Sequence, residues 1–166
     1  MHDKAKYYID KLKLLPHPEG GYYMEIYRSG EFIDIRGLPK RYKNKRVFST
    51  SIYFLLEGQQ VSKFHRLKSD EVWHFYDGDP VKIYILDNNK NLDEVILGKD
   101  LSKGNRFQFT IKKNSWFGAE LIEKNSFALV GCSVSPGFDF DDFELADRNS
   151  LLKIYPQFEN IIKRLA

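Results

Sequence analysis

The stretch that decides the fold is Gly58-Gln-Gln-Val-Ser-Lys-Phe-His-Arg-Leu-Lys-Ser-Asp-Glu-Val-Trp-His-Phe-Tyr-Asp-Gly78. Two strand-like runs, 61–67 and 72–76, flank a polar turn, and His65 and Glu71 lie on either side of it. A hairpin at this turn would bring both side chains into one cavity. A buried imidazole that faces a buried carboxyl group can hold a metal, transfer a proton or bind a polar ligand. The stretch therefore predicts the position of a site and leaves its chemistry open.

Short strands are predicted along most of the chain. Besides 61–67 and 72–76, the strand-like runs are Tyr22–Arg28, Phe48–Leu56, Val81–Leu86, Glu94–Leu97, Arg106–Ile111, Glu120–Ile122 and Phe127–Val134. Turn residues separate them at short, fairly regular intervals, which is typical of an antiparallel sandwich or barrel. The longest expected loops are Ser29–Arg46 and Ser135–Asn149.

Helices are expected only at the two ends of the chain. Ala5, Tyr8, Ile9, Leu12 and Leu15 recur at helical spacing, so a short helix is expected over about 3–15, ended by Pro16. Near the other end, Pro156 suits the first turn of a helix whose apolar stripe is Phe158, Ile161, Ile162 and Leu165. We expect one domain over 1–166, with a barrel over about 20–135 and a C-terminal loop and helix over about 136–166.

Composition narrows the class of protein. The chain has 26 basic and 23 acidic residues, a balance too even to indicate nucleic-acid binding, and the basic run 40–46 is interpreted as a solvated loop. Its one cysteine, Cys132, excludes an intrachain disulfide and lies in an apolar run, as a buried side chain would. Neither a signal peptide nor an apolar run long enough to cross a membrane is recognised, so we expect a cytoplasmic protein without membrane contact.

The hairpin segment resembles the first motif of the cupin superfamily. That motif runs Gly, five residues, His, one residue, His, three or four residues, Glu, six residues, Gly. His65, Glu71 and Gly78 fit it, but the interval from Gly58 to His65 is one residue too long and Leu67 replaces the second histidine. In the second cupin motif a histidine is expected near Trp116.

Further segments are similar to one cupin subgroup, the Cupin-5 family. They are Pro16–Tyr23, Ser51–Leu56, Phe64–Arg66, Ser69–Pro80, Trp116–Ala119 and Ser135–Phe140. The resemblance implies an antiparallel jelly-roll β-barrel like that of RmlC. It implies no specific activity, because the family has none that is settled.

His65 and Glu71 are the leading candidates for catalytic residues. In a regular strand Glu71, Trp73 and Phe75 share one face, and His74 points to the other unless a β-bulge intervenes. The alternative to a functional role for Glu71 is a purely structural one, in an ion pair with a residue such as Arg28.

Other candidates for ligand binding surround the expected cavity. They are His17, Glu19, Tyr23, Arg28, Trp73, His74 and Trp116. In the strand 22–28, alternation places Tyr23 and Glu25 on one face and Arg28 on the opposite face. The loop 136–142 either folds over the barrel mouth or only connects elements.

Three functions compete. The first is binding of a small polar metabolite, such as a sugar derivative, and the second is a metal-independent sugar epimerase or isomerase that uses His65 as base. The third is a metal-dependent cupin enzyme, for which the resemblance implies three histidines and a glutamate. Leu67 and Trp116 stand where two of those histidines belong, so we expect no bound metal and no cofactor. We expect a homodimer, because an unpaired sheet edge has to be covered.

Overall fold

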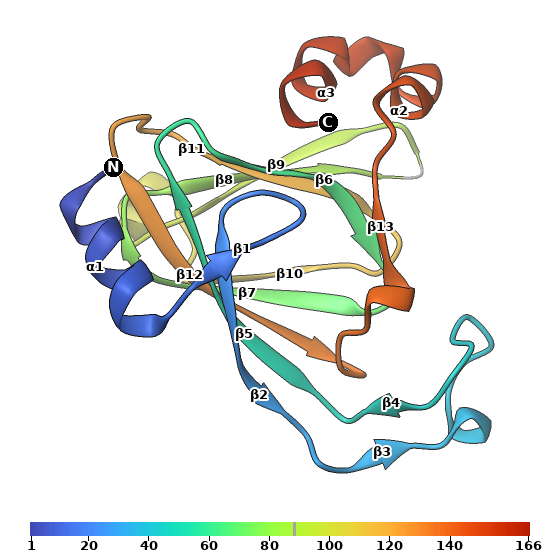
Figure 1. Ribbon diagram of the computed structural model, residues 1–166. Helices are drawn as coiled ribbons and strands as arrows, with labels where there is room; N and C mark the ends of the chain where they lie inside the picture. The colour runs from blue at the N-terminus through green and yellow to red at the C-terminus, as the bar shows by residue number, and fades with distance from the viewer. Residues whose placement is uncertain (88) are drawn as a thin grey trace.

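Two antiparallel sheets face one another and form the body of the protein (Figure 1). The structure is a computed structural model that describes residues 1–87 and 89–166. The six-stranded sheet has the order β1 (Leu15–Pro16), β2 (Tyr22–Arg28), β5 (Thr50–Glu57), β12 (Phe127–Ser135), β7 (Asp70–Gly78) and β10 (Gln108–Ile111). The five-stranded sheet has the order β13 (Phe143–Leu145), β6 (Val61–Leu67), β11 (Trp116–Leu121), β8 (Val81–Leu86) and β9 (Leu92–Leu97). The predicted mainly antiparallel β fold of the jelly-roll type is confirmed.

The strand alternation that the sequence predicts places the core between the sheets. In β7 the side chains of Glu71, Trp73 and Phe75 are buried, whereas His74 is half-buried and Tyr76 is exposed. Trp73 joins Phe54 and Phe117 in the largest buried cluster, to which both sheets contribute. Large aromatic and branched side chains fill the space between the sheets around Trp73. Each buried one contributes roughly 1.5–3 kcal/mol of hydrophobic stabilisation.

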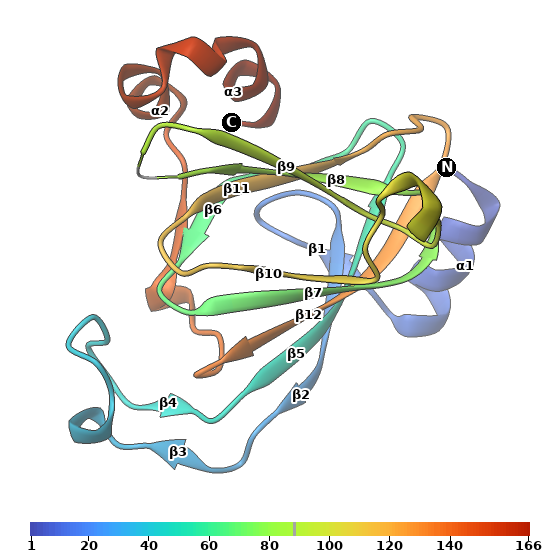
Figure 2. The same cartoon turned by 180° about the vertical axis from the view of Figure 1, so that it is seen from behind.

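Helices lie against part of the outer face of each sheet, as Figure 2 shows from behind. Helix α1 (Asp3–Leu12) lies against β5 and β12, where Ala5 packs with Leu55 and Phe127. Helices α2 (Arg148–Ile154) and α3 (Glu159–Leu165) cover the five-stranded sheet. In the described residues, no helix has both the length and the apolar character needed to cross a lipid bilayer.

The C-terminal region differs from the single helix that we expected. It consists of α2, the 3-10 turn η4 (Pro156–Phe158) and α3. Pro156 has no N–H to continue the hydrogen bonding of α2, so the chain turns and starts a second helix. The first helix is also shorter than expected, since Lys13 adopts a left-handed φ of 55° and ends it.

The two long loops contain further structure. The 29–46 region forms an arm with β3 (Phe32–Ile33), the 3-10 turn η1 (Ile35–Gly37) and β4 (Arg46–Val47), which projects from the sheets in Figure 1. The 135–149 region contains η3 (Phe140–Asp142) and β13, and a 3-10 turn η2 (Leu101–Lys103) lies between β9 and β10. The 135–149 region thereby returns to the five-stranded sheet beside the mouth of the cavity.

Candidate functional site

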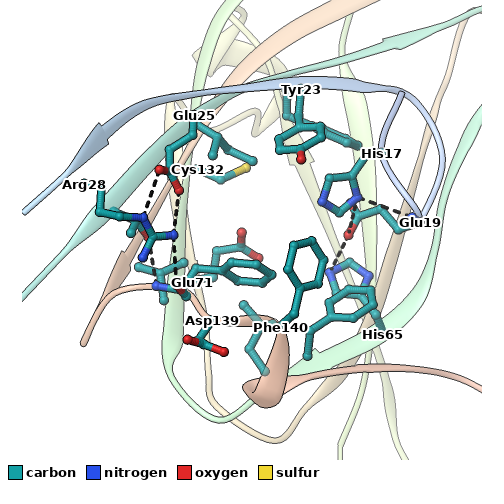
Figure 3. A pocket seen from close by; sticks show the side chains of 17 residues that line it. His17, Glu19, Tyr23, Glu25, Arg28, His65, Glu71, Cys132, Asp139 and Phe140 are labelled. Atoms are coloured by element: carbon teal, nitrogen blue, oxygen red, sulfur yellow. Dashed lines mark hydrogen bonds and ion pairs between the residues drawn. The ribbon is translucent and has the colours of Figure 1, made fainter. Parts of the chain in front are cut away.

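A cavity of about 450 Å³ lies at one end of the barrel, between the two sheets. Its walls are β2 with the turn before it, the start of β5, the end of β6, the start of β7, the end of β12 and the segment 138–143 (Figure 3). Along the inward face of β7, Glu71 lines the cavity and Trp73, the next inward residue, lies in the solid core. The cavity thus begins where the aromatic packing of the barrel ends.

The segment His17–Gly21, between β1 and β2, brings two polar side chains to this cavity. It folds into a tight turn in which the Gly20 N–H donates to the carbonyl of His17, and Lys63 N–H of β6 donates to the Glu19 carbonyl. Gly20 has a φ of +111°, and a Cβ there would lie 2.2 Å from the carbonyl oxygen of Val61. Only glycine allows the turn to approach β6 this closely.

Glu19 is the direct partner of His65. The Glu19 Oε2 atom lies 3.1 Å from His65 Nε2, and its Oε1 accepts a 2.8 Å hydrogen bond from the Ser62 hydroxyl. The other imidazole nitrogen of His65 lies 2.7 Å from the carbonyl oxygen of Lys63, so it must carry a proton. Both ring nitrogens of His65 are therefore engaged, and one proton is shared between Nε2 and the Glu19 carboxyl group.

His17 is held in one tautomer by the same turn. Its Nδ1 accepts a 3.3 Å hydrogen bond from the backbone N–H of Glu19 and lies 3.5 Å from Glu19 Oε2. In the neutral ring the proton is then on Nε2, and Figure 3 shows this second nitrogen on the cavity side of the ring. His17 therefore presents a hydrogen-bond donor to a ligand.

Glu71 is the group that stands out in the site. Its residue is 8% exposed, and its Oε2 atom is fully buried without a hydrogen-bond partner in the part of the chain that the structure describes. The Nε1 atom of Trp73 also lacks a well-formed hydrogen bond, and Trp73 and the Cys132 thiol are the polar neighbours that partly lower the pKa of the Glu71 carboxyl group. Buried carboxyl oxygens are nearly always paired, because an unpaired one costs about 1–3 kcal/mol or more.

Burial shifts the acid–base properties of the cluster. It raises the pKa of both Glu19 and Glu71 to about 7, an effect that the neighbouring histidines partly oppose. Burial also lowers the pKa of His17 and of His65. Two carboxyl groups in one cavity therefore exchange protons near neutral pH, and the imidazoles favour the neutral form.

At the cavity mouth, Arg28 pairs with Glu25 in a two-point ion pair, with N–O distances of 2.9 and 2.7 Å. A β-bulge makes this possible, because Ile26 has no partner in β5 while Glu25 pairs with Ile52 and Arg28 with Thr50. The strict alternation that we expected would have separated Glu25 from Arg28, so that expectation was wrong. The suggested ion pair between Glu71 and Arg28 is not formed; Arg28 takes Glu25 instead.

The other side of the mouth is aromatic. Phe138, Phe140 and Phe143 contact one another with ring centroids 5.0, 6.1 and 6.3 Å apart, and all three line the cavity. The segment that carries them is fixed by a buried ion pair between Arg46 and Asp142, with N–O distances of 2.6 and 2.7 Å. Of the two roles that we considered for the loop 136–142, its position favours the one at the mouth.

The structure brings six of the predicted site residues to the cavity wall: His17, Glu19, Tyr23, Arg28, His65 and Glu71. The other three lie elsewhere. Trp73 is 1% exposed in the core, and His74 is on the opposite face of β7. Trp116 packs outside the barrel with Phe64 under the C-terminal helices, with the Arg66 guanidinium 4.4 Å from its ring centre.

Trp116 points outward because the inward-facing positions of β11 are shifted by one residue from those that the motif suggested. Its neighbour Phe117 takes the inward position and contacts His65 with a centroid distance of 4.0 Å. Sequence reasoning also passed over Glu25, Ser62, Asp139 and the phenylalanines as site residues. Periodicity carried a signal only for Glu25, which shares a strand face with Tyr23.

The residues do not fit the metal site of three histidines and one glutamate. Leu67 lines the cavity where the motif has its second histidine, and Trp116 points away from it. His65 has both nitrogens engaged. In residues 1–87 and 89–166, no three His, Cys, Asp or Glu side chains are grouped to hold a metal ion.

Comparison with known proteins shows the relatives of this chain. The family model described as Cupin superfamily (DUF985) matches residues 6–146. A solved protein from Shewanella oneidensis is 42% identical over 98% of this chain and 96% of its own, with a TM-score of 0.88. A hypothetical protein from Leishmania major is 35% identical over 98% of both chains, with a TM-score of 0.87.

More distant matches share the fold alone. Bacillus subtilis oxalate decarboxylase is 13% identical, with a TM-score of 0.55 over 91% of this chain and 36% of its own. A search of curated proteins found no match.

Proposed function

Since the chain belongs to the Cupin_5 family (DUF985) of the cupin superfamily, we propose that its barrel cavity binds a small polar metabolite anchored by Glu71. The observation that carries the proposal is the buried Glu71 carboxyl group, which lines the cavity and whose Oε2 atom has no hydrogen bond within the described residues. The cavity volume lies within the usual range of about 300–1,000 Å³ for small-molecule sites. A ligand that donates a hydrogen bond would satisfy this carboxyl group.

The surrounding groups complete a recognition site. The Tyr23 side chain and the protonated His17 Nε2 lie at one side of the cavity, and Phe140 of the phenylalanine cluster lies across from Tyr23 (Figure 3). His65, held by Glu19 and Lys63, positions the wall and does not offer a free nitrogen. This arrangement supports binding over an isomerase that uses His65 as its base.

An isomerase based on Glu71 is the second candidate. Its pKa of about 7 is suited to a general base or acid, which works best when its pKa is near the working pH. Deuterium that enters a bound ligand from heavy water, and does not enter it with Glu71→Gln, would identify this activity.

The test of the binding proposal is a search of a metabolite library by native mass spectrometry, followed by calorimetry of each hit with Glu71→Gln. We expect the substitution to weaken a hit by roughly 10–100-fold, because a hydrogen bond to a charged group contributes about 1.5–3 kcal/mol. The matched control is Glu123→Gln, at an exposed position. Hits that bind Glu71→Gln as tightly as the parent protein would contradict the assignment of Glu71.

We also propose a homodimer formed through the exposed side of β2 and the arm. Strand β2 pairs with β1 only at Tyr22 and Tyr23, and Ile26, Tyr27, Phe32 and Phe48 are exposed nearby. An open edge with exposed apolar side chains favours strand pairing with another copy. Sedimentation analysis should give the dimer mass at micromolar concentration, and Tyr27→Lys should shift the equilibrium to monomer. A monomer for the parent protein would contradict this prediction.

A further inference from the structure

The balance of charges in the cavity suggests the chemical class of its ligand. Four carboxyl-bearing residues line it: Glu19, Glu25, Glu71 and Asp139. Among the described lining residues, Arg28 is the one lysine or arginine. The two lining histidines favour the neutral form, because burial lowers the pKa of His17 and of His65. The lining therefore has more potential negative than positive charge.

The guanidinium group of Arg28 is already bound to a carboxylate of the protein. Arg28 uses its Nε and Nη2 atoms on the Glu25 carboxylate, and Nη2 also lies 3.3 Å from the carbonyl oxygen of Phe138. An anionic ligand would have to compete with Glu25 for it. By contrast, Glu71 Oε2 has no partner among the described residues. The charge available to a ligand is thus a carboxylate.

The aromatic wall favours the same kind of ligand. Phe138, Phe140 and Phe143 pack edge to face at one side of the cavity, and two further aromatic residues, Tyr23 and Phe54, also line it. The faces of aromatic rings are electrically negative and attract cations that lie over them. Aromatic walls beside an unpartnered carboxylate are the combination that binds organic ammonium groups.

We propose that the cavity selects a small organic cation, an amine whose protonated nitrogen donates to the Glu71 carboxylate while its apolar body lies against the phenylalanine cluster. This inference rests on the proposed function and narrows it to one class of ligand. It differs from a sugar-like neutral ligand in one measurable respect, the need for a positive charge.

The test uses three probes of nearly the same shape: benzylamine as cation, benzyl alcohol as neutral donor and benzoate as anion. In calorimetry with the full chain, benzylamine should bind at least about tenfold more tightly than benzyl alcohol, because its hydrogen bond to Glu71 is between two charged groups. Benzoate should not bind. Glu71→Gln should remove the preference for the amine, and Glu123→Gln should keep it.

A second variant tests the aromatic wall and leaves the buried histidines and glutamates of the cavity unchanged. Phe140 is 55% exposed, so Phe140→Leu should fold. We expect it to weaken benzylamine severalfold and to leave benzyl alcohol nearly unchanged, since leucine keeps an apolar surface but has no ring face. Equal losses for both probes would show that the wall contributes only apolar contact and would remove the cation–π part of the proposal.

The direction of the pH dependence gives an independent readout. A cation favours ionised Glu71, so benzylamine should release protons on binding and its affinity should rise with pH through about 7. The titratable or charged groups around Glu71 come from the β1–β2 turn, β2, β6, β12 and the 135–142 segment: His17, Glu19, Tyr23, Glu25, Arg28, His65, Cys132 and Asp139. Repeating the titration with Glu71→Gln separates the contribution of Glu71 from theirs.

Several results would overturn the proposal. They are benzoate binding, equal affinity for amine and alcohol, amine affinity that falls as pH rises, or no amine binding at millimolar concentration. A neutral ligand that binds the parent protein and is weakened by Glu71→Gln would disprove the cation preference and leave the proposed metabolite site standing. If no ligand is found whose binding depends on Glu71, both the cation preference and the proposed metabolite site are disproved.

Discussion

Asp142→Ala is expected to lower the free energy of unfolding by about 3–5 kcal/mol, the cost typical of breaking a buried ion pair by removing one partner. The side chains of Arg46 and Asp142 are 2% and 4% exposed, and Lys68 Nζ lies 3.2 Å from the same carboxylate. Without Asp142 two cations face each other without this counter-ion. Chemical denaturation of the variant and the parent protein measures the difference.

The neighbouring Asp141 provides the matched control. It is exposed, so Asp141→Ala should change stability by no more than about 0.5 kcal/mol. The double variant Arg46→Met/Asp142→Leu should recover much of the loss, because it removes both buried charges. A loss below about 1 kcal/mol for Asp142→Ala would mean that the pair behaves like a surface ion pair. The segment with the phenylalanine cluster would then need another anchor.

Glu71→Gln is expected to stabilise the protein above neutral pH and to have little effect near pH 4.5. The pKa of Glu71 rises from its ordinary value of 4.5 to about 7 on folding, mainly because of burial. Between these values the folded protein holds a proton that the unfolded chain has lost, so the free energy of unfolding falls as pH rises. A full shift of this size corresponds to roughly 3 kcal/mol, and glutamine avoids this cost because it stays neutral.

Thermal and urea unfolding between pH 4.5 and 8 would measure this effect. The variant includes a secondary gain, since ionised Glu71 also repels the nearby Glu19 carboxylate. Glu123→Gln, at an exposed position, should follow the parent protein at every pH. A stability difference that is constant with pH, or that reverses in sign, would show that Glu71 does not titrate in this window.

Local patterns were enough to predict most of the strands. The predicted ranges 22–28, 61–67 and 81–86 agree with β2, β6 and β8 at both ends. Alternation also placed Glu71 and Trp73 on the buried face of β7. These features follow from the period of two along a strand, which neighbouring residues determine by themselves. The motif built on His65, Glu71 and Gly78 similarly identified the family and the end of the barrel that holds the site.

The chemistry of the site depended on contacts between distant segments. Glu19 reaches His65 because the glycine turn lies against β6, so the expected pairing of His65 with Glu71 alone missed its closest carboxylate. The bulge at Ile26, which the register with β5 determines, brings Arg28 to the cavity.

The motif suggested that Trp116 points into the barrel, but Phe117 takes that position. The pairing of β11 with β6 and β8 decides which of the two faces is buried between the sheets. The sequence by itself thus determined most of the strands, the family and the place of the site. Only the tertiary structure decided which polar group remains unpartnered, because hydrogen-bond partners are assigned by register and packing between segments far apart in the chain.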